Sequence, residues 1–437
     1  MSENRASTGA PPGSAVSALL PAGRAARVFL AFALAYFIST LLRAVTATLA
    51  PVLSAEMHLH ASDLGLLAGG YFLGFALTQL PLGTLLDRHG PRKVILAFLA
   101  VAVAGCAGFA LATGFTGLLV ARVVVGMGVS ACLMAPLTGY RRWLQPGMQL
   151  RANSWMLMTG SLGMVAATLP VQWLMPMLGW RGIFWVLAAL LVLSMAVIAG
   201  IVPPWQTGGL APSMRTDART GAGAGAEGIG YGDIARHPYF RMMVPLGFIN
   251  YGGMVAVQTL WAGPWMVRLG GASAEASATG LFAINLSMLC AFWLWGTAMP
   301  ALSRRGLTAE RAIAAGTPLS LVLLAVVVVL GGDAGWPMWA AFCVASTCMA
   351  LSQPAVAMAM PEQAAGRALS AFNLAIFAGV FCAQWGIGLV IDGLQALGWE
   401  EDASFRGAMG LYLLACTLGY ALFLTGWRRV RRAKLAA

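Results

Sequence analysis

Charged residues are scarce in this chain, at 10% of its 437 residues. A water-soluble domain carries roughly a quarter charged residues. Hydrophobic residues make up 59% instead, and the mean hydropathy is +0.78. The apolar residues fall in blocks of about twenty or more, the length that crosses a bilayer core. The scarcity of charge therefore excludes a water-soluble protein and predicts one that crosses a membrane many times.

Acidic residues are fewer than basic residues. There are 15 of them against 27 lysines and arginines, which gives a formal net charge of +12. An excess of this kind also occurs in nucleic-acid-binding proteins, where it forms one basic face. Here the basic residues sit in short clusters between apolar blocks, as membrane topology requires. We therefore expect no nucleic-acid partner.

The cysteines and methionines are not spaced as a metal site or a set of disulfides would require. All seven cysteines lie inside apolar blocks, and no pair has the spacing of metal ligands. The 23 methionines raise copper import as an alternative, because thioethers bind Cu(I). No two methionines are four residues apart, however, as neighbours on one helix face would be. We expect packing roles for both residue types, no metal site and no cofactor.

The apolar blocks predict twelve helices in two sets of six. The first set covers residues 28–53, 62–86, 94–113, 116–140, 151–176 and 180–203; the second covers 240–266, 276–301, 310–330, 336–360, 366–391 and 405–427. Two six-helix bundles, residues 28–203 and 240–427, are thus predicted around a polar linker, residues 204–239. Residues 1–27 form the expected N-terminal tail and residues 428–437 a basic C-terminal tail. The first apolar block is too long for a signal-peptide core, so we expect a retained helix.

The basic residues also predict how the helices are oriented. With the N-terminus inside, only five of the 27 lysines and arginines fall outside the cytoplasmic segments, which leaves 22 inside. The five are Arg43, Arg122, Arg181, Arg268 and Arg406. The positive-inside rule then places both termini and the linker in the cytoplasm of a bacterial-type inner membrane.

The two halves resemble each other in sequence. Residues 65–68 (Gly-Leu-Leu-Ala) recur at 280–283 (Gly-Leu-Phe-Ala), an offset of 215. Residues 151–154 (Arg-Ala-Asn-Ser) recur at 367–370 (Arg-Ala-Leu-Ser), an offset of 216. A nearly constant offset between corresponding helices indicates an internal duplication, which is common in transporters.

The loop after the second predicted helix carries the most specific motif in the chain. It reads Gly83-Thr84-Leu85-Leu86-Asp87-Arg88-His89-Gly90-Pro91-Arg92-Lys93. This resembles the loop signature of the major facilitator superfamily of secondary transporters, GxxxDRxGxRK. The resemblance implies a conformational latch on the cytoplasmic face, made by Gly83, Asp87, Arg88, Gly90 and Arg92.

Two more segments resemble the same superfamily. Arg122 is followed by Gly126 and Gly128 in an apolar helix, and residues 179–185 open the sixth helix with Gly-Trp-Arg-Gly. Small residues allow helices to approach closely, so we expect a structural or coupling role for Arg122, Gly126 and Gly128. The resemblance implies an all-α membrane fold of twelve helices in two pseudo-symmetric six-helix bundles with alternating access. The GPxxGG pattern of many drug antiporters is absent from residues 160–170, which disfavours drug efflux.

Arg43 is the main candidate for substrate binding. It lies ~4 Å from the midpoint of the first predicted helix, too deep for its side chain to reach the interface. Charged residues at this depth are functional candidates, and helical spacing puts Tyr36 and Thr40 on the same face. The alternative is a structural arginine bound to carbonyl groups of neighbouring helices.

No carboxylate is expected beside Arg43. All fifteen acidic residues fall in loops or at helix ends, and Asp63, Asp87 and Asp392 come nearest to the bilayer core. A substrate anion would supply the missing acceptor bidentately. Some organic-anion transporters of the superfamily have a similar arginine preceded by an aspartate. Leu42 stands at that place here, which argues against proton coupling through such a pair.

The seventh predicted helix supplies the second half of the expected site. Asn250, Gln258 and Trp261 share one arc of that helix by regular helical spacing. Further polar side chains in the same half are Asn285, Ser352, Gln353 and Asn373. For Trp261, a packing role is an equally good interpretation.

Together these patterns predict a monomeric secondary transporter that moves a small organic anion. Its expected partners are the lipid bilayer, the small-molecule substrate and, for symport, a coupling proton. A proton-coupled exporter of drugs or metabolites is the alternative, and metal import is less favoured. An enzyme is not expected, because the sequence has no nucleophile–base pair, cofactor motif or large extramembrane domain.

Overall fold

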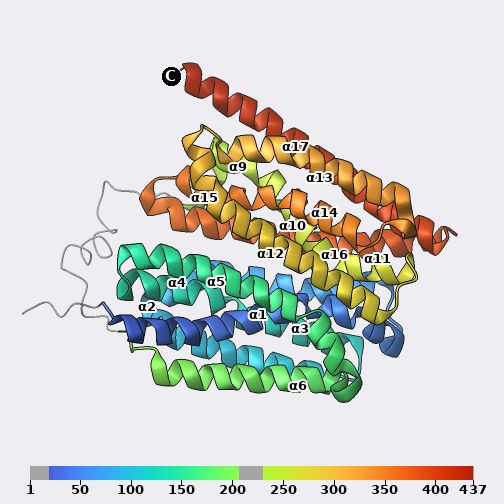
Figure 1. Ribbon diagram of the computed structural model, residues 1–437, viewed down its shortest axis with the longest axis horizontal. Coiled ribbons are helices and arrows are strands. Elements are labelled where there is room, and N and C mark those ends of the chain that lie inside the picture. Colours follow the sequence, from blue (N-terminus) through green and yellow to red (C-terminus); the bar gives the residue numbers. More distant parts are fainter. Residues whose placement is uncertain (1–18, 206–229, 437) are drawn as a thin grey trace, which may run out of the picture.

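The computed structural model describes residues 19–205 and 230–436, and within these ranges every regular element is a helix (Figure 1). The first half contains α1 (Ala22–Met57), α2 (Ala61–Leu111), α3 (Phe115–Val129), α4 (Ala131–Trp143), α5 (Pro146–Ala166) and α6 (Leu169–Ile201). Most of the expected N-terminal tail and linker lies outside the described residues. The all-helical fold class predicted from the sequence is confirmed.

The second half begins with two short helices, α8 (Tyr231–Arg236) and α9 (Pro238–Pro245). One long helix then continues through η1 (Leu246–Tyr251), α10 (Gly252–Ala256), η2 (Val257–Trp261) and α11 (Ala262–Arg268). The remaining elements are α12 (Ala274–Arg304), α13 (Ala309–Leu330), η3 (Gly331–Asp333), α14 (Trp336–Ser346), η4 (Thr347–Leu351), α15 (Ser352–Met358), α16 (Glu362–Ala396) and α17 (Glu401–Ala436).

Ten of the described helical stretches are long and apolar enough to cross a membrane. One of them, α2, has 51 residues and contains two of the predicted helices, which meet at Gly90 with a φ of 76°. Glycine adopts this left-handed conformation readily. Pro91 follows as the first residue of the next helical segment, where its missing N–H costs nothing.

The fifth predicted helix, residues 151–176, is interrupted. Helix α5 ends at Ala166, and α6 begins at Leu169. Pro170 cannot donate a backbone hydrogen bond to the preceding turn, which weakens the helix at this point. The hydroxyl of Thr48 in α1 donates to the carbonyl oxygen of Ala167, 2.8 Å away, and so satisfies a group that the break frees. A bend at Gly179, with a φ of 62°, separates the end of the fifth predicted helix from the sixth within α6. Together with the bend in α2, this reconciles the ten helical stretches with the twelve predicted spans.

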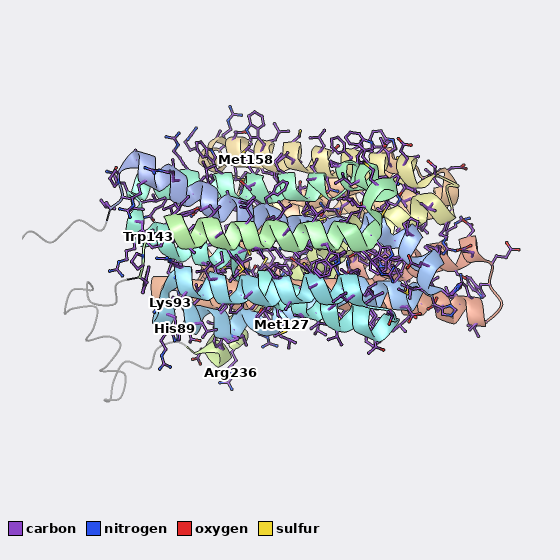
Figure 2. All side chains as sticks on the ribbon, turned by 90° about the horizontal axis from the view of Figure 1, so that it is seen from below. His89, Lys93, Met127, Trp143, Met158 and Arg236 are labelled. Atoms are coloured by element: carbon purple, nitrogen blue, oxygen red, sulfur yellow. The ribbon has the colours of Figure 1, made fainter. Side chains whose placement is uncertain are left out.

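The two halves of the chain form two bundles that lie side by side (Figure 1). We call the end that carries the Gly90 bend and the C-terminus the terminal end, and the opposite end, with residues 58–60 and 397–400, the distal end. Figure 2 shows His89, Lys93 and Trp143 at the terminal end and Met127 near the middle.

Matching ion pairs at the distal end reflect the internal duplication. In the first half, Glu56 at the end of α1 pairs with Arg181 of α6 at 2.6 Å. In the second half, Arg268 at the end of α11 pairs with Glu401 at the start of α17 at 3.2 Å. Both pairs join the first long helix of a bundle to the last one, with the two signs exchanged. All four side chains are exposed, so these pairs contribute little to stability.

Candidate functional site

Arg43 lies where the two bundles meet. Its guanidinium carbon is 5.5 Å from the ring centre of Phe75 in α2 and 5.6 Å from that of Phe377 in α16. The two rings come from different halves of the chain and also contact each other, with 4.5 Å between their centres. Arg43 remains partly exposed, whereas its neighbours Leu42 and Ala44 are buried.

Phenol groups, and no carboxylate, complete the surroundings of Arg43. Tyr36, Tyr71 and Tyr251 are close enough to interact with it electrostatically. The three ion pairs of the described residues all lie elsewhere. Its Nε atom is buried without a hydrogen-bond partner. Within residues 19–205 and 230–436, Arg43 forms no ion pair with an acidic side chain, and its guanidinium retains unused donor capacity.

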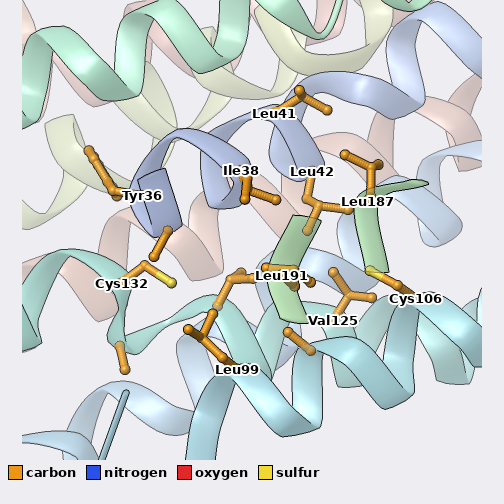
Figure 3. Close-up of a cluster of buried hydrophobic side chains, with 14 of the residues drawn as sticks. Tyr36, Ile38, Leu41, Leu42, Leu99, Cys106, Val125, Cys132, Leu187 and Leu191 are labelled. Carbon is orange, nitrogen blue, oxygen red and sulfur yellow. The ribbon is translucent and has the colours of Figure 1, made fainter. Parts of the chain in front are cut away.

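The opposite face of α1 is ordinary apolar core. Figure 3 shows Ile38 and Leu42 of α1 pointing toward Val125 and Leu191. All four side chains are buried in the same cluster. Tyr36, which the spacing puts on the face of Arg43, belongs to the same buried cluster.

Tyr36 and Thr40, predicted to share the face of Arg43, pack against α5. A Cβ atom added at Gly160 would lie 2.5 Å from the ring of Tyr36, and one at Gly163 would overlap the Thr40 hydroxyl. The Thr40 hydroxyl donates to the Tyr36 and Phe37 carbonyl oxygens at 3.2 and 3.0 Å. Its donor is thus used within α1, and Tyr36 is the better placed of the two for contact with a ligand beside Arg43.

The three polar residues predicted on one arc of the seventh helix point in different directions. The Asn250 side-chain amide donates to the Cys416 carbonyl oxygen in α17 at 2.9 Å. That of Gln258 donates to Asn285 Oδ1 in α12, also at 2.9 Å, and the Trp261 indole donates to the Gln384 carbonyl oxygen in α16 at 3.2 Å. The structure therefore does not bring the three together.

Two π-helical stretches, η1 and η2, explain the divergence. They contain all three residues, Asn250 in η1 and Gln258 and Trp261 in η2. A π-turn holds about one residue more than an α-turn, so it rotates the following side chains by roughly 100° relative to a regular helix. π-Turns are frequent at functional sites.

Gln384 is a buried polar residue that the sequence reasoning missed. It is completely buried, and its Nε2 donates to the Thr259 hydroxyl at 3.0 Å, while Oε1 has no hydrogen-bond partner. A glutamine in an otherwise apolar stretch of predicted helix was the available signal. Its hydrogen bond to Thr259 connects α16 to η2, the second π-helical stretch of the seventh helix. Gln384 lies about two helical turns from Phe377 along α16.

Arg122 is fully buried, and although its Nε atom, like that of Arg43, has no hydrogen-bond partner, both of its Nη atoms are hydrogen-bonded to α1. One Nη atom donates to the Leu42 carbonyl oxygen at 2.9 Å, and the other donates to the Thr46 hydroxyl. Its guanidinium also lies over the ring of Tyr71, 5.3 Å from the centre. Arg122 therefore joins α3 to α1 and leaves little capacity for a ligand.

The glycines after Arg122 make close helix packing possible. A Cβ atom at Gly126 would overlap the Tyr71 carbonyl oxygen in α2, and one at Gly128 would overlap the backbone of Ala102. Only glycine fits at such distances. Both glycines therefore set how closely α3 lies against α2.

The predicted latch residues lie at the terminal end. Asp87 and Arg88 are exposed, and Asp87 forms no ion pair within the described residues. Arg92 donates to the Ala199 carbonyl oxygen in α6, and Gly90 is covered by the ring of Trp205. A Cβ at Gly83 would meet no atom within 4 Å. In this state the Gly90–Arg92 part of the motif is packed, while Gly83 and Asp87 face open space.

Helix α2 of the first bundle packs against α16 of the second bundle at the boundary between them. The two helices approach each other most closely at the distal end. A Cβ at Gly388 would overlap the Ala61 carbonyl oxygen, and one at Gly65 would overlap the Gln384 carbonyl oxygen. At the terminal end, Gly83 and Gly366 both have open space around them. The two bundles are therefore in close contact at the distal end, whereas Gly83 and Gly366 at the terminal end touch no other helix.

The described residues form no group of three or more His, Cys, Asp or Glu side chains suited to a metal ion. The site around Arg43 consists of one guanidinium, aromatic rings and phenols between two membrane-spanning bundles.

Residues 32–384 match the sequence profile of the Major Facilitator Superfamily, which is most of the chain. The protein belongs to this transporter superfamily. The resemblance inferred from the loop signature is thereby confirmed, and so is the fold class that it implies. As a member of the superfamily, the protein is a multi-pass membrane transporter.

Individual relatives are distant. A cis,cis-muconate transport protein of Acinetobacter baylyi is 28% identical over 170 residues, which are 38% of this chain and 40% of that protein. A galacturonate transporter of Dickeya chrysanthemi is 28% identical over 150 residues, 34% of this chain and 44% of that protein. The chain thus matches less than half the length of either relative.

The solved structure of a D-xylose-proton symporter shares the superfamily fold with this chain. The TM-score is 0.73 at 12% sequence identity, and the match covers 92% of this chain and 97% of the symporter. At this identity the similarity concerns the arrangement of helices alone.

Proposed function

We propose that this protein is a secondary active transporter that moves a small organic anion by alternating access, and that it has no enzymatic activity of its own. The observation that carries the proposal is the position of Arg43. Its guanidinium lies between rings of the two bundles, is partly exposed and has an unpaired Nε atom. A charge at this depth without a carboxylate partner needs an acceptor, and a substrate anion provides one.

The same surroundings favour a carboxylate with a flat, weakly polar body. Phe75 and Phe377 lie against Arg43, and the other groups near it are phenols. The Thr40 hydroxyl and one N–H of each of the Asn250 and Gln258 amides already donate to protein acceptors. A polyhydroxylated acid would leave hydroxyl groups unpaired against aromatic rings, which costs free energy.

The two relatives described above support the anion class, because muconate and galacturonate are both carboxylates. They differ in the body of the molecule: muconate is planar and unsaturated, whereas galacturonate is a hydroxylated ring. Muconate therefore fits the aromatic surroundings of Arg43 better.

Binding to the purified protein tests this proposal. In titration calorimetry or a thermal-shift assay, we expect cis,cis-muconate or benzoate to bind and galacturonate to bind at least about tenfold more weakly, a difference of the size that one unpaired polar group produces. Equal or tighter binding of galacturonate would contradict the flat-body proposal. Uptake and efflux in proteoliposomes, with and without a pH gradient, would separate import from proton-coupled export.

We further propose that the terminal end is cytoplasmic, from the distribution of basic residues in the sequence. A reporter fused after Gly225, in the central linker, should then be active only when it is of the type that works in the cytoplasm. A periplasm-dependent reporter that becomes active at this position would contradict the orientation. With the terminal end cytoplasmic, the distal closure described above is a closure toward the periplasm.

A further inference from the structure

Asp392, near the end of α16, binds the first turn of α2 across the boundary between the bundles. Its Oδ1 accepts from the backbone N–H of Ala61 at 3.1 Å, and its Oδ2 accepts from that of Ser62 at 2.8 Å. Ala61 and Ser62 are the first two residues of α2, whose N–H groups have no partner within the helix. A carboxylate is favoured at this position by the helix dipole as well.

This contact differs from an ordinary helix cap because, under the alternating access proposed above, its two partners move apart during transport. Asp392 belongs to the second bundle, and Ala61 and Ser62 belong to the first. Within the first bundle, α2 already has its own capping interaction, in which Asp63 accepts from the N–H of His60 at 3.1 Å. Opening of the distal end must break the contacts of Asp392 and leave that of Asp63 intact.

The antiparallel register of α2 and α16 suggests a counterpart at the terminal end. Gly388 faces Ala61, Gln384 faces Gly65, and Phe381 lies 3.0 Å from a Cβ atom at residue 69. For each residue forward along α2, the contacting residue of α16 is thus about one residue earlier in the chain. Continued for a few more turns, this register sets Gly83 opposite Gly366, which have open space here.

The same register brings Asp87, at the terminal end of α2, opposite the first residues of α16. Those are residues 362 and 363, the equivalents of Ala61 and Ser62 at the start of their helix. Asp87 is exposed and forms no ion pair with any residue that the structure describes. Each helix therefore carries an aspartate at the end that faces the N-terminus of the other helix, and one of the two contacts is made.

We propose that Asp392 is the lock that holds the distal end closed, and that it acts in opposition to the terminal-end latch at Asp87 that the superfamily signature implies. When the distal end is closed, Asp392 caps α2 and Asp87 is free. When the distal end opens, Asp392 leaves α2, and Asp87 caps α16 at the closed terminal end. The balance between the two caps sets the ratio of the two states in the absence of substrate.

Distances between spin labels test the lock without any substrate, so the result does not depend on the proposed anion. Labels attached at Ala55→Cys and Leu397→Cys would report opening of the distal end, since both positions are exposed there and belong to different bundles. The exposed Cys290 and Cys382 are first replaced by serine, and the five other cysteines are buried.

Asp392→Asn keeps one acceptor oxygen but removes the negative charge and turns an NH₂ group toward a backbone N–H, so it should raise the ratio of distal-open to distal-closed molecules about fivefold. The matched control is Asp402→Asn. Asp402 lies at the same end, but its partner, Arg406, is in the same helix at 3.4 Å. Asp402→Asn should therefore leave the label distances unchanged.

Two more variants keep the test decisive. Ala61→Pro removes one of the two donors at a helix position where proline is well accepted, and it should shift the ratio in the same direction by less. Adding Asp87→Asn to Asp392→Asn weakens the opposite cap and should return the ratio toward the original value. The lock is refuted if Asp392→Asn and Ala61→Pro leave the distances unchanged, or if Asp402→Asn changes them equally.

Discussion

Replacement of Arg43 by glutamine should abolish most binding of the anionic substrate while the protein still folds. The change removes both the charge and the fork of N–H donors, and a bidentate charged pair lost in this way weakens binding on the order of 100-fold. The fold should survive because Arg43 makes no ion pair within the described residues and its Nε atom has no partner. Titration of purified protein with cis,cis-muconate or benzoate measures the affinity, and thermal unfolding measures the stability.

Arg43→Lys separates charge from geometry. Lysine keeps the positive charge but has no planar fork, so transport should continue with a half-saturation concentration raised about tenfold. Arg151→Gln is a suitable control, because Arg151 is exposed, far along the chain from α1 and stacked on Trp155. It should change neither affinity nor stability.

Two outcomes would contradict the role of Arg43. Full transport by Arg43→Gln would show that the arginine does not bind the substrate. Loss of folding in Arg43→Gln, with Arg151→Gln normal, would show a structural arginine, the alternative that the sequence leaves open. Either result removes the main support for an anionic substrate but leaves the superfamily and the proposed lock at Asp392 untouched.

The twelve-helix fold is predictable from the sequence because it depends on local properties. The length of each apolar block sets each span, and the loop signature at residues 83–93 is contiguous in the chain. The bend in α2 is local as well, since it needs only Gly90 followed by Pro91. The break between α5 and α6 had a local signal in Pro170, but the group that satisfies it, the hydroxyl of Thr48, comes from another helix.

The arrangement of the site is less predictable because it depends on departures from regular helix geometry and on contacts between halves. Regular spacing puts Asn250, Gln258 and Trp261 on one arc, but the π-turns direct them toward three different helices. Phe75 and Phe377 are ordinary apolar residues in the sequence, and only the packing of α2 on α16 brings them to Arg43. Their roles, and those of the other predicted site residues, stay predictions until tested.

Asp392 is a residue whose unusual position can be seen in the sequence but whose partners cannot. Its position near the end of an apolar block marks it as unusual, but nothing in the chain near residue 392 points to the start of α2, about 330 residues earlier. The N–H groups that it binds are backbone groups, which leave no trace in the side-chain pattern. Contacts of this kind can be found only in the folded arrangement.

Gly126→Ala should destabilise the protein strongly and reduce transport. A Cβ atom at this position would overlap the carbonyl oxygen of Tyr71, so α2 and α3 would have to move apart. Overpacking of a tight helix contact costs about 3 kcal/mol. Tyr71 also donates from its hydroxyl to the Ser39 carbonyl oxygen at 3.1 Å and lies beneath Arg122, so its displacement disturbs the surroundings of both arginines.

The matched control is Gly108→Ala, in the same pair of helices. A Cβ atom there would lie 3.7 Å from the Cβ of Ala121, an ordinary contact distance, and alanine favours a helix over glycine by up to about 1 kcal/mol. Gly108→Ala should therefore unfold at the same temperature as the original protein or slightly higher, while Gly126→Ala unfolds earlier. If both variants are equally stable, the close contact between Gly126 and Tyr71 does not set the spacing of α2 and α3. In that case the spacing of α2 and α3 would need another physical explanation, such as the hydrogen bonds of Arg122 to α1.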